Sequence, residues 1–229
     1  MVKTFYKQIV NILNSFYLLF HSDINYSKSF FYYFKVSIAK QNHLIVTKST
    51  IQKSLIVIEG VNNEIIANEA FIASCNISIN GKNNKIILKD GVKLRKGIIN
   101  IRGSNCNIII GENTSFGQVR MINVGKNNDV IIGRDCLFAD HIEIWASDTH
   151  SIYDKYGNFI NPEKPIIIGN NVWIGSYVKI LKGITIGDNT IVGLNSFVTK
   201  NIESGILCAG NPLRVLRSEV SWTLKYENE

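Results

Sequence analysis

Toward its C-terminal end, the chain repeats an aliphatic residue at every sixth position. The repeat is carried by Ile168, Ile174, Ile180, Ile186, Val192 and Val198. A second lane of smaller residues lies four positions further on, at Val172, Val178, Ile184, Thr190, Ser196 and Ile202. A helix has a period of about 3.6 and an ordinary strand a period of about 2, so neither explains this spacing. The pattern predicts short flat strands with a bend after each, wound into a solenoid.

The same spacing indicates the shape of one coil. If each coil has three sides, residues 18 positions apart lie over one another at a rise of ~4.8 Å, the usual distance between neighbouring strands. Glycine follows four of the six aliphatic positions, at Gly169, Gly175, Gly187 and Gly193, and suits tight corners. We therefore predict an all-β solenoid in which equivalent side chains form ladders along the axis.

A longer repeat occupies the middle of the chain. Its turns read Gly60-Val61-Asn62-Asn63, Gly81-Lys82-Asn83-Asn84, Gly103-Ser104-Asn105-Cys106 and Gly125-Lys126-Asn127-Asn128, at spacings of 21, 22 and 22 residues. Each turn is followed by an aliphatic run such as Ile108-Ile109-Ile110. A coil of 18 residues plus a turn of about four accounts for this period. Gly and Asn supply the left-handed backbone conformations that such a turn needs.

The repeat is absent from both ends of the chain. In residues 1–45, which are rich in aromatics, near-helical spacing relates Phe5, Ile9, Leu13, Phe16 and Phe20. We predict that this segment is an amphipathic helix that caps the open end of the solenoid. Docking on a membrane or on a biosynthetic complex is the alternative. Residues 46–217 would then form the solenoid domain, and residues 218–229 a C-terminal tail.

An interruption separates the two repeats. Ile144 and Ile168 are separated by a multiple of six residues and so keep the phase of the hexapeptide repeat. The segment 146–165 between them is largely polar and cannot form a regular coil. It contains Asp148 and His150. Long loops within compact repeats are more often functional than accidental, so we predict a protruding functional loop at 146–165.

Composition and charge narrow the class of protein. Cys75, Cys106, Cys136 and Cys208 show no paired short spacing, which argues against a disulfide framework or a zinc site built from cysteines. There is no 18-residue apolar run, and the stretch IVNILNSFYLLF lacks a following small-residue cleavage site. We therefore expect a cytoplasmic protein without a transmembrane segment, with peripheral contact to the inner membrane left open. The net charge of +7 suits an anionic partner, but the scattered lysines are not typical of a nucleic-acid-binding module.

The run IIIGNNVWIGSYVKILKGITIGDNTIVGLNSFVTKNI and the later AGNPLRVLR resemble the hexapeptide acyltransferase family. The resemblance covers roughly residues 46–217. It implies a left-handed parallel β-helix, a homotrimer with sites between subunits, and transfer of acetyl groups from acetyl-CoA. The segment IIGRDCLFADHIEIWASDTHSIYD is similar to the active-site segment of the capsular polysaccharide, or polysialic acid, O-acetyltransferases.

Acetyl transfer from a thioester to a hydroxyl needs a base and donors for the oxyanion. His150 matches the catalytic histidine of the family, and neutral imidazole is available as a base near neutral pH. Asp148 or a backbone carbonyl could orient its other ring nitrogen. The resemblance also implies that the indole N–H of Trp173 binds the thioester carbonyl or the oxyanion. His141 and Trp145 are interpreted as coil residues near the site.

The residues that would contact CoA are predicted partly from their spacing and partly from the resemblance to the family. Lys182 and Lys200 are 18 residues apart, so they should share one edge of the solenoid, where a phosphate would relieve their repulsion. The resemblance implies that CoA contacts come from Ser176, Leu194, Thr199 and Lys200. It also implies that Arg214 and Arg217 lie near the nucleotide phosphates, where planar guanidinium groups are favoured.

Three other functions are compatible with a solenoid of this kind. A gamma-type carbonic anhydrase shares the predicted fold but needs three histidine ligands, and the four histidines here are poorly spaced, so no metal site is predicted. A non-catalytic binding solenoid would release no thiol from acetyl-CoA. An antibiotic or amino-sugar N-acetyltransferase would use the same CoA groove with another acceptor. We predict an O-acetyltransferase that acts on a sugar hydroxyl of a capsular or other surface polysaccharide, an acceptor that could itself be acidic.

Overall fold

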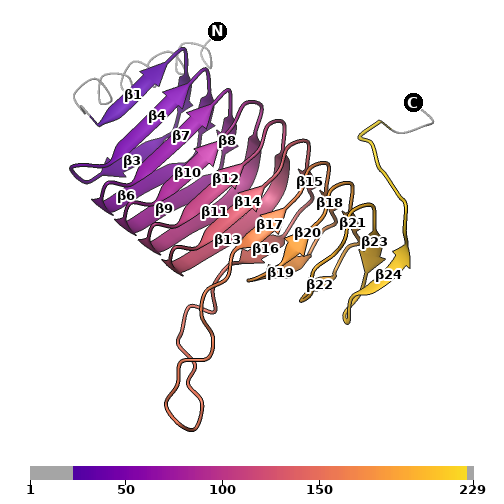
Figure 1. Ribbon diagram of the computed structural model, residues 1–229. Helices are drawn as coiled ribbons and strands as arrows, with labels where there is room; N and C mark the ends of the chain where they lie inside the picture. Colours follow the sequence, from indigo (N-terminus) through magenta and orange to yellow (C-terminus); the bar gives the residue numbers. More distant parts are fainter. Residues whose placement is uncertain (1–22, 226–229) are drawn as a thin grey trace.

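The computed structural model describes residues 23–225 and shows a three-sided parallel β-solenoid (Figure 1). These residues form no α-helix, and hence no helical segment that meets the length and apolarity needed to cross a bilayer. The predicted helix around Phe5–Phe20 lies outside the described residues.

Each coil contributes one strand to each of three faces, which we name A, B and C in chain order. Face A is an eight-stranded sheet of β1 (Ile24–Ser27), β4 (His43–Thr47), β7 (Glu64–Asn68), β10 (Lys85–Leu88), β12 (Asn107–Ile110), β14 (Asp129–Ile132), β17 (Ile166–Ile168) and β20 (Thr185–Ile186). Face B consists of β2 (Phe30–Tyr32), β5 (Thr50–Gln52), β8 (Phe71–Ala73), the first parts of β11 (Lys93–Ser104) and β13 (Ser115–Lys126), β15 (Leu137–Phe138), β18 (Trp173–Ile174), β21 (Ile191–Val192) and β23 (Leu207–Ala209).

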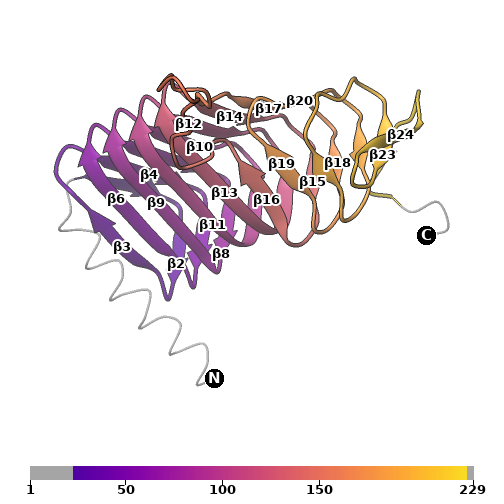
Figure 2. The ribbon, with the colours of Figure 1, turned by 90° about the horizontal axis from the view of Figure 1, so that it is seen from below.

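Face C consists of β3 (Lys35–Ile38), β6 (Leu55–Val61), β9 (Cys75–Lys82), the second parts of β11 and β13, β16 (Ile142–Trp145), β19 (Lys179–Leu181) and β22 (Phe197–Val198). Figure 2 shows these strands side by side along the solenoid. Because β11 and β13 run through the corner between faces B and C, these two faces form a single hydrogen-bonded sheet. The last strand, β24 (Arg214–Arg217), pairs antiparallel with β23.

Both predicted lanes of the hexapeptide repeat point into the solenoid. Ile174 pairs with Val192 and Ile180 with Val198, so residues 18 positions apart are stacked as predicted. The first lane is at most 1% exposed and the second at most 7%. This ladder of aliphatic side chains is the hydrophobic core, and Phe116 and Phe138 continue it with ring centroids 4.4 Å apart.

The middle repeat forms the predicted left-handed turns. Asn62, Asn83, Asn105 and Asn127 have φ between 52° and 58°. Asn63 lies inside the turn and donates from Nδ2 to Oδ1 of Asn42 at 3.0 Å, and Asn84 donates in the same way to Asn63 at 2.9 Å. Gly81 is required at its corner, since a Cβ atom would lie 1.8 Å from the carbonyl oxygen of Gly103.

The solenoid begins earlier than residue 46. Ile24 on β1 already pairs with Leu44 on β4, and Phe31 on β2 pairs with Ile51 on β5. Residues 24–45 are therefore coils, and the prediction that they belong to a helical cap was wrong. The corners of these coils are made by residues such as Lys28 and Tyr33, both with φ of 48°, rather than by the glycine and asparagine that mark the later turns.

The four cysteines contribute to the core rather than to the surface. All are buried and carry free thiols. Burial raises the pKa of the Cys75 thiol to about 12 and those of Cys136 and Cys208 to about 11. They are therefore neutral thiols near pH 7, which is not the state of a nucleophilic cysteine.

Candidate active site

Residues 146–165 leave the solenoid between β16 on face C and β17 on face A, as predicted. The segment projects as a long hairpin from the corner between these faces, which we call corner CA (Figure 1). The insertion doubles the register step, because Arg134 bonds to Asn170, 36 residues later, whereas the following step from Asn171 to Asn189 is 18. Beyond the insertion the coil resumes without a change in phase.

The tip of the hairpin is closed by Asp154. Its Oδ1 atom accepts hydrogen bonds from the backbone N–H of Tyr156 at 2.8 Å and of Asn158 at 2.9 Å. Hydrogen bonds from Asn158 hold the pKa of the Asp154 carboxyl below its ordinary value. Tyr153 and Phe159 face each other in an antiparallel bridge, with ring centroids 6.0 Å apart. The hairpin therefore has its own internal order.

Lys182 anchors the base of the hairpin to the solenoid. Its Nζ atom lies 2.5 Å from Oδ2 of Asp148, 2.9 Å from the carbonyl oxygen of Asn161 and 3.1 Å from that of Pro162. The Lys182 side chain is only 16% exposed. Its hydrogen bond holds the pKa of Asp148 below the ordinary value. The register of β19 with β22 leads Lys182 and Lys200 to the same corner, as their spacing of 18 predicted. The Lys182 ammonium is paired with Asp148 of the chain itself, and the phosphate contact stays a prediction.

His150 lies at the base of the hairpin, beside this anchor. Asn161 donates from Nδ2 to the carbonyl oxygen of His150 at 2.9 Å and to Oδ2 of Asp148 at 2.8 Å. Asn161 thus joins the histidine backbone to the carboxylate that Lys182 holds. The sequence pattern did not single out Asn161, because its role depends on the folding of the hairpin back on itself.

The imidazole of His150 is exposed to solvent. Within residues 23–225, no hydrogen bond to its ring is formed, and Asp148 is directed to Lys182 and Asn161. The suggestion that Asp148 orients the ring was therefore wrong for the single chain. The backbone around the histidine is nevertheless fixed, since Thr149 has a φ of 63° and its N–H donates to Oγ of Ser147 at 3.0 Å.

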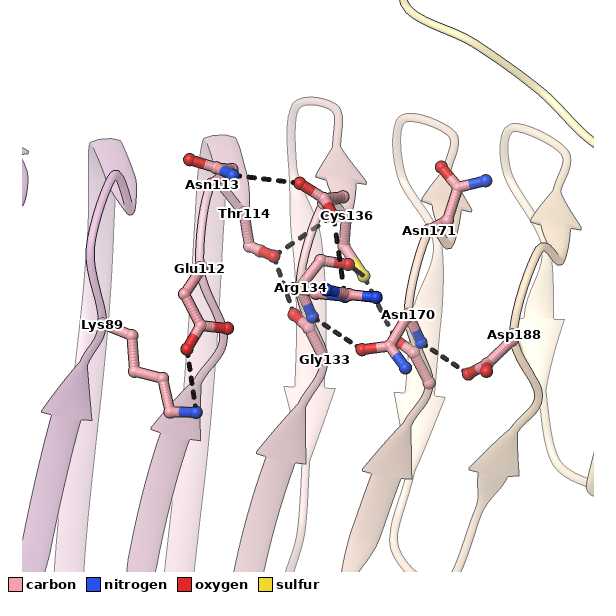
Figure 3. A network of polar contacts seen from close by, with 12 residues as sticks. Lys89, Glu112, Asn113, Thr114, Gly133, Arg134, Cys136, Asn170, Asn171 and Asp188 are labelled. Atoms are coloured by element: carbon pink, nitrogen blue, oxygen red, sulfur yellow. Dashed lines mark hydrogen bonds and ion pairs between the residues drawn. The ribbon is translucent and has the colours of Figure 1, made fainter.

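Trp173 begins β18, just past the corner between faces A and B, which we call corner AB. A ladder of polar contacts fixes this corner (Figure 3): Asn170 accepts from the N–H of Arg134 at 3.0 Å, and its own N–H donates to Asp188 at 2.7 Å. The Trp173 side chain is 40% exposed, and its ring centroid lies 5.8 Å from that of Trp222. The indole of Trp173 is therefore partly exposed on the surface of the single chain.

The remaining predicted residues lie on other parts of the surface. Thr199 and Lys200 follow β22 at corner CA, the corner of His150. Ser176 and Leu194 lie at the corner between faces B and C, which we call corner BC, where the N–H of Asn195 donates to the carbonyl of Ser176 at 2.8 Å. Arg214 and Arg217 are exposed on β24. One chain therefore brings His150, Thr199 and Lys200 to the same corner but places Trp173, Ser176 and Leu194 on different corners.

His141 and Tyr177 add an aromatic pair that the sequence analysis did not foresee. Both residues are at corner BC with left-handed backbone, at φ of 58° and 63°. Their rings stack with centroids 4.7 Å apart and planes 10° from parallel. Tyr177 directly follows Ser176, so His141 lies beside a predicted CoA contact.

Known proteins with similar sequences include bacterial transferases with hexapeptide repeats. Residues 165–200 match the family model described as bacterial transferase hexapeptide (six repeats). The chain is 34% identical over 131 residues to a polysialic acid O-acetyltransferase of Escherichia coli O1:K1 / APEC, covering 57% of this chain and 42% of that protein. It is 40% identical over 113 residues to the galactoside O-acetyltransferase of Escherichia coli (strain K12), covering 48% of this chain and 54% of that protein. The chain thus spans about half the length of these curated relatives.

Two solved structures resemble nearly the whole molecule. The polySia specific acetyltransferase NeuO is 26% identical with a TM-score of 0.69, covering 89% of each chain. The polysialic acid O-acetyltransferase OatWY is 26% identical with a TM-score of 0.70, covering 90% of this chain and 93% of that one. The repeat and the parallel coils agree with these similarities, which relate residues 165–200 in sequence to the bacterial transferase hexapeptide family and nearly the whole described solenoid in fold to two O-acetyltransferases.

Proposed function

We propose that this chain is an acetyl-CoA-dependent O-acetyltransferase that acts on a sugar hydroxyl of a capsular or other surface polysaccharide. The observation that carries the proposal is the position of His150, exposed at the base of a hairpin that Lys182, Asp148 and Asn161 lock to the solenoid. The likeness in fold to NeuO and OatWY supports polysialic acid, or a related acidic glycan, as the class of acceptor.

The proposed reaction uses His150 as the general base. A neutral ring nitrogen takes the proton from the acceptor hydroxyl, whose oxygen attacks the thioester carbonyl of acetyl-CoA. The indole N–H of Trp173 donates to the oxyanion of the tetrahedral intermediate. The intermediate then expels the CoA thiolate, which takes the proton back from the imidazolium. The acetyl ester and CoA leave, and the enzyme regains its initial protonation state.

Because His150 and Trp173 lie at different corners of one chain, we propose that the site is completed between subunits of a closed homotrimer. Cyclic symmetry would place corner CA of one subunit against another corner of its neighbour. The hairpin supports this arrangement, since Ile152 is 50%, Tyr153 60% and Tyr156 77% exposed. Apolar side chains that are this exposed on a projecting hairpin favour burial against a second chain. A monomer mass by light scattering at micromolar concentration would contradict the trimer.

The proposed function is tested by incubating the protein with acetyl-CoA and candidate glycans. We expect thiol release that depends on a glycan and a mass increase of one acetyl group on the glycan, measured by mass spectrometry. His43→Ala, which alters an exposed histidine on face A, is the matched control for His150→Ala and should remain active. Thiol release only with aminated acceptors would indicate an N-acetyltransferase, and no release with any acceptor would indicate a non-catalytic binding solenoid.

A further inference from the structure

A groove of about 690 Å³ follows corner BC along the N-terminal half of the solenoid. Its wall is built from two or three residues of each of six successive coils, beginning with Tyr33 and Lys35 and ending with His141, Ile142 and Glu143. These coils are joined in sequence by backbone hydrogen bonds and strand pairing, which include the step from Lys96 to Gln118. The groove thus extends over about five strand spacings, or ~24 Å, parallel to the solenoid axis.

The charge of the groove is predominantly positive. Lys35, Lys53, Lys96 and Arg120 line it, and within residues 23–225 they take part in none of the ion pairs that the structure forms. The acidic residue of the wall, Glu143, has partners of its own. It accepts from Nε1 of Trp145 at 2.8 Å and lies 3.9 Å from Nζ of Lys179. The guanidinium of Arg120 lies over the Trp145 ring, with its Cζ atom 5.3 Å from the ring centroid. None of the four cations forms an ion pair with a carboxylate of the described residues, so their charge can act on an external anion.

Apolar side chains accompany these cations. Leu55 is 36%, Ile98 43% and Tyr33 48% exposed, and all three line the groove. Cations that alternate with apolar surface suit a chain of sugar rings that carry carboxylates, since the rings have apolar faces and the carboxylates pair with ammonium groups. A flat bilayer fits less well, because the charges follow a narrow groove along one corner.

The end of the groove nearest the C-terminal coils lies beside the predicted CoA contact at Ser176. His141 belongs to the groove wall and also stacks on Tyr177, the neighbour of Ser176 at the predicted CoA contact. We propose that the groove holds several successive units of a linear acidic polysaccharide and leads one of its hydroxyls to the acetyl donor. This inference rests on the proposed function and extends it, because it assigns a polymer-binding surface on coils far from His150.

The groove is tested with a triple variant, Lys53→Gln, Lys96→Gln and Arg120→Gln, in the full-length chain. The matched control carries Lys28→Gln, Lys40→Gln and Lys82→Gln, which remove three exposed positive charges outside the groove. The probe is fluorescently labelled polysialic acid of about ten sugar units, the length that five strand spacings can contact with overhang at both ends. Binding is measured by fluorescence anisotropy at low salt and again at high salt.

We expect the groove variant to bind the polymer about tenfold more weakly than the unaltered protein, since each exposed charge contact contributes modestly. The control variant should stay within about twofold, and high salt should reduce the difference between the two variants. Neutral dextran of equal length should bind to none of the three proteins. Equal binding of polysialic acid by the groove variant and the control would overturn the inference.

Two other outcomes would also overturn it. A change in the solution mass of the groove variant would identify this face as a contact between copies of the chain. Loss of binding to phosphatidylglycerol vesicles in the groove variant, without loss of polymer binding, would identify a membrane surface. The proposed function is tested separately by thiol release from acetyl-CoA in the unaltered protein with polysialic acid at high concentration as acceptor. Failure of the chemistry then abolishes thiol release, whereas failure of the groove leaves thiol release intact and polymer binding equal in the groove variant and the control.

Discussion

The Nζ atom of Lys182 lies 2.5 Å from Oδ2 of Asp148, and this contact joins the solenoid to the hairpin that carries His150. The two residues are 34 positions apart in the chain. Since Asn161 binds both Asp148 and the backbone of His150, the ion pair fixes the position of the histidine without touching its ring. Lys182 and Asp148 are therefore positioning residues, distinct from the groups that we propose act on the substrate.

Lys182→Met should lower the turnover rate about 10- to 100-fold and leave acetyl-CoA affinity nearly unchanged. The reason is geometric, because a displacement of about 1 Å at a reacting group can cost two orders of magnitude. Hydrogen exchange of residues 146–165 should rise in the same variant. The matched control is Lys179→Met, three residues earlier on β19, which removes an exposed lysine whose Nζ atom lies 3.9 Å from Oε1 of Glu143. Unchanged exchange in the hairpin of Lys182→Met would refute the anchoring role.

Acid should release the hairpin. The pKa of Asp148 is held below its ordinary value of 3.8, so the ion pair contributes fully above that pH and is lost as the pH falls through the lowered value. We expect limited proteolysis within 146–165 to accelerate at about pH 3 relative to about pH 6, using an acid-active protease with a rate calibrated on a peptide. Asp148→Asn should show a flatter dependence on pH over this range, and identical profiles in both proteins would argue against the assignment.

His150→Ala and Trp173→Phe should separate the base from the oxyanion donor. Removal of the base should cost about 10²–10⁴-fold in turnover, while CoA affinity stays nearly intact. Trp173→Phe keeps a ring and deletes the N–H donor, and it should cost about 10–10³-fold. His150→Ala that retains more than about a tenth of the activity between about pH 6 and 9 would contradict the proposed mechanism.

Lys200→Ala and Arg214→Ala should weaken acetyl-CoA binding more than acceptor binding. Both side chains are exposed, so loss of a charge-assisted contact should reduce affinity by about 3- to 30-fold. Calorimetric titration with CoA is the measurement. Lys126→Ala, an exposed lysine on an earlier coil, serves as the control. Unchanged CoA affinity in both variants would remove these residues from the site.

The two inward-facing lanes of the hexapeptide repeat were predictable, because a six-residue period fits neither a helix nor an alternating strand. Only a three-sided coil stacks Ile174 on Val192, 18 residues later. The start of the solenoid could not be predicted. Its corners are formed by residues such as Lys28 and Tyr33, which adopt the left-handed conformation although glycine and asparagine are the residues that usually signal such a corner. Within the site, sequence could place His150 on a loop. It could not reveal that Asp148 turns to Lys182, because that contact depends on how a long hairpin folds back on the coil.

The antiparallel pairing of β24 with β23 has a consequence for how the molecule meets its own copies. A stack of parallel coils ends in a strand with unpaired backbone groups, and such an open sheet edge can recruit another chain. At the C-terminal end of face B, β24 reverses direction and covers that edge with a strand that carries Arg214 and Arg217. Two like charges on the outermost strand disfavour end-to-end addition of another solenoid, so this short reversal protects the protein against growth into fibres.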